Sequence, residues 1–215
     1  MRDFCIIGLG LFGQILAQEL LSLGHTVVGV DRNPRVIDKL KDRIPDLYVL
    51  DSTNPDALRE IRIKEFDCVV LAIGDAMESN ILTAQNLVEL GIENIWARAE
   101  SEVHDHILKR LGIDQTFFTE RDTALRMASL MHNPNIYDMI DLLEGYSMAR
   151  IRVGPTHSGK TLKEIDFREK FGVLVIAIRR RNETTPLAGP NDKIYEGDYL
   201  IVAGRSEKLN KLKEV

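Results

Sequence analysis

The sequence feature that most limits the fold is a glycine turn near the start of the chain. An apolar run at residues 4–7 leads into Gly8-Leu9-Gly10-Leu11-Phe12-Gly13, and a helix-forming segment follows. The spacing Gly-x-Gly-x-x-Gly is weak evidence alone, but between a strand and a helix it is typical of a dinucleotide-binding β-α-β unit. Gly8 is expected to make the tight turn, Gly10 to admit a pyrophosphate and Gly13 to let helix and strand pack closely. We expect the phosphates to lie at the helix N-terminus, against Gly8, Gly10, Leu11, Phe12 and Gly13.

The rest of the first half repeats the pattern of a strand followed by a helix. β-Branched runs at 4–7, 26–30, 47–50, 68–73, 95–97 and 116–118 alternate with helical segments. Asn33-Pro34 and Asn54-Pro55 each offer an N-cap followed by proline at the first helical position. Residues 1–119 are therefore expected to form an α/β domain of the Rossmann type, a doubly wound parallel sheet of six strands.

Further ligand contacts are expected where the strands end. Asp31 closes the second strand, where a carboxylate accepts hydrogen bonds from ribose hydroxyls and disfavours a 2′-phosphate. Arg32 beside it weakens that exclusion, because an arginine pairs with phosphate or stacks on adenine. Ligands of open α/β sheets bind at the carboxyl ends of the strands. This rule adds the candidates Asp51, Ser52, Thr53, Ile73 and Gly74, and the charged residues Arg98 and Glu120.

After the sixth strand the pattern changes. Residues 120–144 carry more apolar residues than one helix face needs, and they are expected to form one or two crossover helices broken at Asn133-Pro134-Asn135. Residues 145–215 are expected to form a second, smaller α+β domain. Its predicted elements are strands at 148–153, 173–179 and 199–202, a short helix at 162–170 and a final helix capped by Ser206.

A second phosphate-binding pattern occurs in this smaller domain. Residues 154–161, Gly-Pro-Thr-His-Ser-Gly-Lys-Thr, match the P-loop G-x-x-x-x-G-K-[ST]. The helix that follows is short, and no downstream strand ends in an aspartate able to hold magnesium. About 70 residues are also too few for the parallel sheet of a P-loop enzyme. We therefore expect Pro155 and Gly159 to shape a turn and Thr161 to cap the short helix.

Composition narrows the possible partners and the location. The formal net charge is -5, so no overall positive field favours nucleic acid. The longest apolar runs are too short to cross a bilayer, and no signal-peptide pattern opens the chain. The sequence predicts a cytoplasmic protein that reaches a membrane only through a partner.

Together these features resemble a known family. The glycine turn, Val30-Asp31, Asp51-Ser52-Thr53, Ala72-Ile73-Gly74, residues 95–99 and Glu120-Arg121-Asp122 all match the regulatory subunits of Trk/Ktr-type potassium uptake systems. Those proteins join an RCK (KTN) nucleotide-binding lobe to a small C-terminal lobe. In the second half the resemblance rests on residues 159–162, 171–173, 175–179 and Gly197-Asp198.

The resemblance implies a switch that is not an enzyme. Such subunits pair through the crossover helices, form homo-oligomeric rings, typically octamers, and gate a membrane potassium channel or transporter according to the bound ATP, ADP or NAD(H). It further implies Mg²⁺ or Ca²⁺ near Glu120 between subunits, and cyclic di-AMP in the C-terminal lobe. Some ATP-sensing relatives carry an arginine within the glycine turn where this chain has Leu11.

Two alternatives share the same first domain. An NAD-dependent oxidoreductase needs a proton-transfer group beside the nicotinamide. The candidates His104, His106 and Lys109 are interpreted instead as the polar face of a helix capped by Ser101. A regulator of a different cation transporter or antiporter carries every motif named above.

Overall fold

The computed structural model describes residues 1–74, 76–132, 136–181, 183–209 and 212. The chain divides into two compact units, Met1–Asp122 and Thr123–Val215. None of the described helices is both long enough and apolar enough to span a membrane.

The first unit contains a six-stranded parallel sheet, and it confirms the predicted α/β fold. The strands are β1 (Asp3–Ile7), β2 (Thr26–Asp31), β3 (Asp46–Val49), β4 (Cys68–Leu71), β5 (Ile95–Arg98) and β6 (Gln115–Phe117). They lie in the order β3-β2-β1-β4-β5-β6. Strand β1 lies in the middle of the sheet, β2 and β3 are added on one side of it, and β4 to β6 are added on the other. This order is that of a doubly wound dinucleotide-binding sheet.

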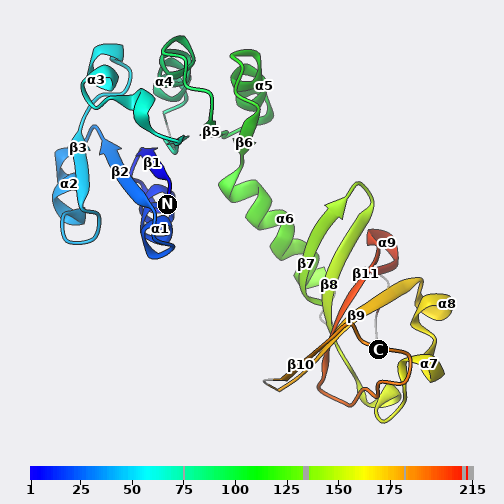
Figure 1. The fold of residues 1–215 in the computed structure, drawn as a ribbon. Helices are drawn as coiled ribbons and strands as arrows, with labels where there is room; N and C mark the ends of the chain where they lie inside the picture. The colour runs from blue at the N-terminus through cyan, green and yellow to red at the C-terminus, as the bar shows by residue number, and fades with distance from the viewer. Residues whose placement is uncertain (75, 133–135, 182, 210–211, 213–215) are drawn as a thin grey trace. The chain divides into compact units, whose positions relative to one another are not determined.

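Helices cover both faces of this sheet and bury a core on each (Figure 1). On one face α1 (Leu11–Ser22) and α2 (Pro34–Leu40) pack, and on the other α3 (Pro55–Glu60), α4 (Met77–Glu89) and α5 (Glu102–Arg110). A short 3₁₀ turn, η1 (Ile63–Glu65), precedes β4. The predicted caps are confirmed, since Asn33 and Asn54 each accept a hydrogen bond from the second residue of the helix that they open.

The second unit confirms the predicted smaller α+β domain. Its elements are β7 (Ile136–Leu143), β8 (Tyr146–Arg152), η2 (Pro155–His157), α7 (Leu162–Ile165), α8 (Phe167–Phe171), β9 (Val173–Arg180), β10 (Glu183–Pro186), β11 (Tyr199–Arg205) and α9 (Ser206–Leu209). The strands form an antiparallel sheet in the order β10-β9-β11-β8-β7. Helices α7 to α9 each contribute buried side chains to one core with the sheet. This core includes Ile151, Ile194, Leu200 and Val202, all almost fully buried.

The prediction of helices throughout residues 120–144 is wrong in its second half. Helix α6 covers Thr119–His132, but Ile136–Leu143 is the strand β7, paired antiparallel with β8. Only Glu144 and Gly145 separate the two strands, and Gly145 has a left-handed φ of 75°. A two-residue loop with glycine favours a hairpin, and its ladder outweighs the helix-like spacing of apolar residues. The predicted break at Asn133-Pro134-Asn135 lies outside the described residues.

Two smaller differences concern the end of the chain. The helix predicted at 162–170 is divided into α7 and α8 by Asp166, which has a left-handed φ of 54°. Strand β10 was not predicted, because its Thr-rich, exposed residues lack an alternating apolar pattern.

Candidate functional site

The glycine turn is held by close backbone packing at two of its three glycines. Gly8 has a left-handed φ of 96°, and its amide donates to the carbonyl oxygen of Val30 at 2.8 Å. A Cβ atom on Gly8 would lie 2.9 Å from the backbone nitrogen of Ile73. A Cβ atom on Gly13 would overlap the carbonyl oxygen of Gly8. A side chain at either position would therefore push the turn apart.

Gly10 differs because the space around it is open. It is the N-cap of α1, and a Cβ atom there would meet no described atom within 4 Å. The first turn of α1 contains no acidic residue, and no described side chain caps it. The amides and the positive dipole end of this twelve-residue helix therefore favour an anion beside Gly10.

Two apolar residues of the turn, Leu11 and Phe12, lie in different surroundings. The side chain of Leu11 is 77% exposed. The ring of Phe12 packs instead against Phe117 of β6, with 5.0 Å between ring centroids. Phe12 thus fixes the start of α1 on the sheet, whereas Leu11 has no comparable structural role in the first unit.

Asp31 connects the end of β2 to the glycine turn. Its Oδ2 atom accepts a hydrogen bond from the amide of Leu9 at 2.9 Å, and its Oδ1 atom accepts one from the amide of Asn33 at 2.8 Å. Each carboxylate oxygen has a second lone pair, so these bonds leave Asp31 able to accept from a ribose hydroxyl. The residue therefore also has a structural role, which the sequence did not predict.

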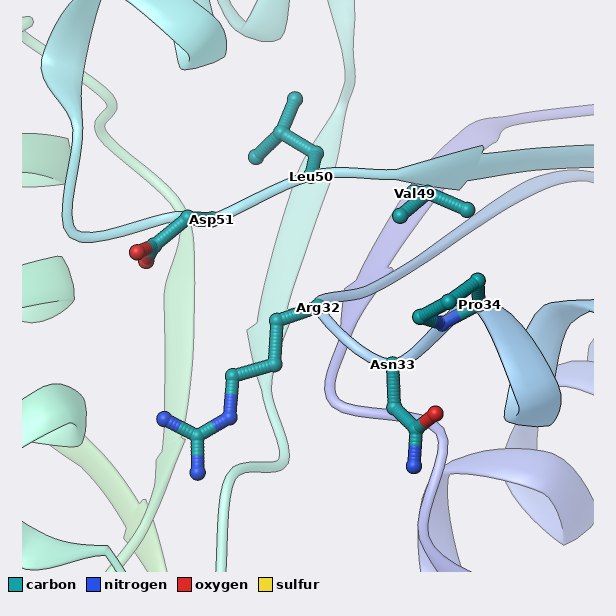
Figure 2. A pocket seen from close by; sticks show the side chains of 6 residues that line it. All are labelled: Arg32, Asn33, Pro34, Val49, Leu50 and Asp51. Carbon is teal, nitrogen blue, oxygen red and sulfur yellow. The ribbon is translucent and has the colours of Figure 1, made fainter.

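A pocket of about 520 Å³ opens beside Asp31, at the carboxyl ends of β2 and β3 (Figure 2). Arg32 and Asn33 line it from the turn before α2, and Asp51 lines it from the segment after β3. Sequence reasoning proposed Arg32 and Asp51 and missed the others, although the rule about strand ends includes them. The lining residues are Arg32, Asn33, Pro34, Val49, Leu50 and Asp51.

The three residues after β3 do not share one role. The Asp51 carboxylate accepts hydrogen bonds from the side chain and the amide of Thr53, which lower its pKa, and the charge of Arg32 lowers it further. The Ser52 side chain is buried, and its hydroxyl pairs with that of Thr83 at 2.8 Å. Asn86 of α4 donates to the carbonyl oxygen of Thr53 at 2.9 Å. Of the three, only Asp51 lines the pocket.

Arg98 and Glu120, the two charged residues predicted at the carboxyl ends of the strands, lie next to each other. Nη2 of Arg98 lies 2.8 Å from Oε1 of Glu120. The Arg98 guanidinium also covers Gly74, whose Cβ atom, if present, would lie 2.8 Å from Cζ. The hydrogen bond from the Thr119 hydroxyl lowers the pKa of the Glu120 carboxyl, and the charge of Arg98 contributes.

Asn80 of α4 is a site residue that sequence reasoning missed. Its side chain is fully buried, and Nδ2 donates to the carbonyl oxygens of Ile73 at 3.0 Å and of Arg98 at 3.2 Å. It therefore ties the ends of β4 and β5 together beneath Arg98. A single asparagine within a helix gives no sequence signal for this role.

The backbone amides of residues 158–161, in the P-loop-like segment, are already used in hydrogen bonds within the protein. The amides of Ser158, Gly159 and Lys160 already donate to backbone carbonyls, and the amide of Thr161 donates to the Glu164 carboxylate. A P-loop needs free amides to hold phosphate. Thr161 caps α7 in a capping box with Glu164, which confirms the predicted cap.

Replacing Lys160 with alanine is therefore expected to leave the affinity of the chain for ADP and ATP unchanged within about twofold, since the amides that a P-loop would offer to phosphate are already paired. Isothermal titration calorimetry of the variant and the unaltered protein measures this. A loss of tenfold or more would show that the segment binds phosphate.

The histidines of α5 are not all on a polar face. Ser101 caps the helix as predicted, accepting from the amide of His104 at 3.2 Å. His106 and Lys109 are exposed, but the His104 ring is fully buried, and burial lowers its pKa. The prediction is thus wrong for His104, because the ring packs inward from α5. A group enclosed in the core is not placed for proton transfer to a substrate.

Two family models match the chain in the same order as its two units. The TrkA-N domain matches residues 4–119, and the TrkA-C domain matches residues 148–215. The Ktr system potassium uptake protein C of Bacillus subtilis is 31% identical over 215 residues, covering 99% of this chain and 96% of the relative. The Ktr system potassium uptake protein A of Vibrio alginolyticus is 29% identical, covering 100% and 98%.

A solved structure agrees in fold. The GsuK channel matches with a TM-score of 0.70 at 19% identity over 100% of this chain, which spans only 40% of the channel chain. A further structure, of the GsuK channel bound to NAD, matches with a TM-score of 0.65 at 19% identity over 97% of this chain and 38% of that one. The chain belongs to the Trk/Ktr family of potassium uptake proteins, in which a TrkA-N domain is followed by a TrkA-C domain.

Proposed function

We propose that this chain is a nucleotide-sensing regulatory subunit that gates a membrane potassium channel or transporter. The observation that carries the proposal is that an open glycine turn and the pocket of Arg32 and Asp51 follow neighbouring strands of the sheet, with Asp31 hydrogen-bonded to the turn at Leu9. The turn provides a site for phosphate, and the pocket has room for an adenine and its ribose. The names of the Ktr relatives support the link to potassium uptake.

The proposed ligands are ATP or ADP, or NAD(H), held in one orientation. The phosphates lie against Gly10 and the first amides of α1, the ribose against Asp31, and the adenine between Arg32 and Asp51. The exposed Leu11 supplies no charge for a terminal phosphate, so discrimination between ATP and ADP is left to other residues. The solved complex of the GsuK channel with NAD supports the dinucleotide.

The proposed assembly is a homo-oligomeric ring, an octamer built from dimers that pair through α6, at the cytoplasmic face of the membrane subunit. Exposed apolar side chains on α6 and β7, among them Leu125, Met131 and Leu143, support pairing through this region. We propose no role for nucleic acid and no catalytic reaction.

Two further ligands, a divalent cation at Glu120 and cyclic di-AMP in the second unit, are separate proposals. Among the described residues no group of three or more acidic, histidine or cysteine side chains could hold a metal ion. Mg²⁺ or Ca²⁺ at Glu120 would therefore need ligands from the nucleotide or a neighbouring subunit. Cyclic di-AMP in the second unit stays a prediction.

Titration calorimetry of the full chain with ADP, ATP, NAD and NADH tests the proposal, with light scattering to measure the mass of the assembly. We expect at least one adenine nucleotide to bind, and the purified membrane potassium subunit to bind the ring. Potassium flux through that complex in vesicles is expected to change with the nucleotide. Absence of binding by all four nucleotides would contradict the proposal.

A further inference from the structure

The described contacts of Arg98 leave part of its guanidinium group without a hydrogen-bond partner. Its side chain is only 16% exposed, and one nitrogen, Nη2, donates to Glu120. Its Nε atom is buried and has no hydrogen-bond partner among the described residues. A buried guanidinium nitrogen without an acceptor is costly, and guanidinium groups bind phosphate through two parallel N–H donors. Arg98 therefore has donor capacity that Glu120 does not use.

Arg98 is also linked to the glycine turn through Ile73 and Gly74. The turn residue Gly8 lies against the backbone of Ile73, and the next residue, Gly74, lies under the Arg98 guanidinium. Asn80 fixes the carbonyl groups of both Ile73 and Arg98 from below. These contacts run along the carboxyl ends of β1, β4 and β5, the edge where a phosphate chain leaving Gly10 would pass.

Glu120, the partner of Arg98, is much more exposed to solvent than Arg98 is. The Glu120 side chain is 77% exposed, and it is the second residue of α6. Because the Glu120 carboxylate lies mostly in water whether or not it is paired, it gains solvation easily when it leaves Arg98. A nucleotide phosphate carries more negative charge than a carboxylate and more acceptor oxygens. Phosphate is thus expected to win the competition for Arg98.

We propose that Arg98 determines specificity for phosphorylated ligands by exchanging the Glu120 carboxylate for a nucleotide phosphate. Without ligand, the ion pair holds the start of α6 against the end of β5. When phosphate takes the guanidinium, Glu120 is released and the first turn of α6 loses this contact. Because α6 leads along the chain into the second unit, occupancy of the site is reported to that unit. This inference rests on the proposed function, since it requires a nucleotide on the glycine turn.

Affinities for ADP and adenosine, measured by calorimetry on the full chain, separate this inference from the proposed function. Arg98→Gln is expected to weaken ADP binding by about ten- to hundredfold, the effect of losing a charged hydrogen bond. Glu120→Gln is expected to tighten ADP binding by about two- to fivefold. Adenosine has no phosphate, so its affinity is expected to be unchanged, which also shows that the variants are folded.

The double variant Arg98→Gln/Glu120→Gln and a matched control test whether Glu120 acts on ADP binding through Arg98. If the partners exchange, Glu120→Gln has no effect on ADP binding once Arg98 is glutamine. A tightening that persists in the double variant would reflect the lost charge alone and would overturn the inference. Asp122→Asn removes an equal charge two residues away, from a side chain that contacts Arg121 and the amide of Phe118. It is expected to leave ADP affinity unchanged, and a tightening equal to that of Glu120→Gln would also overturn the inference.

Hydrogen exchange at the start of α6 tests the release. ADP is expected to increase deuterium uptake by the peptide that covers residues 119–126, and Glu120→Gln to show the higher uptake without ligand. No change in either case would overturn the release of α6. Failure of the unaltered chain to bind ADP and NADH would instead refute the nucleotide site itself, so the two failures are distinguishable.

Discussion

Gly10→Asp is expected to abolish binding of ADP and NADH while leaving the first unit as stable as before, or slightly more stable. Gly10 is the N-cap of α1, with an extended backbone that an aspartate adopts readily, and its Cβ atom would enter open space. Aspartate is a better N-cap than glycine by a few tenths of a kcal/mol. The same carboxylate would occupy the phosphate position and repel it. Calorimetry measures binding, and thermal unfolding measures stability.

The comparison with Gly10→Ala separates charge from bulk. The alanine methyl adds little volume and no charge, so its effect on nucleotide affinity is expected to be clearly smaller than that of aspartate. If Gly10→Asp binds ADP and NADH as the unaltered protein does, the phosphates do not lie at the start of α1. If both variants lose binding only because the protein unfolds, the space at Gly10 is not open.

The fold of the first unit was predictable because its signals are local. The glycine turn, Asn33-Pro34 and Asn54-Pro55 each fix a boundary between strand and helix within a few residues of sequence. Six short β-branched runs between such boundaries leave few arrangements other than a doubly wound sheet. The rule about strand ends predicted Asp51 as a site residue, and Arg32 was predicted as the neighbour of Asp31; both line the pocket.

The features that were missed depend on contacts between distant parts of the chain. Strand β7 is stabilised by its pairing with β8, which outweighs the spacing of apolar residues that resembles a helix. The hydroxyl of Ser52 is paired with Thr83, 31 residues away, so it turns into the protein and not toward the pocket. No local sequence pattern indicates the role of Asn80 or the unpaired Nε atom of Arg98. Side-chain direction at such positions is set by tertiary packing, which a single sequence does not display.

Gly13→Ala is expected to unfold the first unit or to destabilise it by about 3 kcal/mol, in contrast to Gly10→Ala. The added methyl would overlap the carbonyl oxygen of Gly8 and lie 3.2 Å from its carbonyl carbon. Gly8 is held in place, because its amide is hydrogen-bonded to the carbonyl oxygen of Val30 and the backbone of Ile73 leaves no room for a Cβ atom beside it. The gain of up to about 1 kcal/mol that alanine brings to a helix is too small to offset this overlap.

Trp96 makes the measurement specific to the first unit. It is the single tryptophan of the chain and lies on β5, so its fluorescence during urea unfolding follows this sheet. Gly10→Ala adds the same methyl group to the same turn, in open space, and its midpoint is expected to match that of the unaltered protein. Equal midpoints for Gly13→Ala and Gly10→Ala would show that Gly13 is not pressed against Gly8. A large gap between them would mean that two glycines three residues apart have separate roles, Gly13 in closing the turn and Gly10 in leaving room for a ligand.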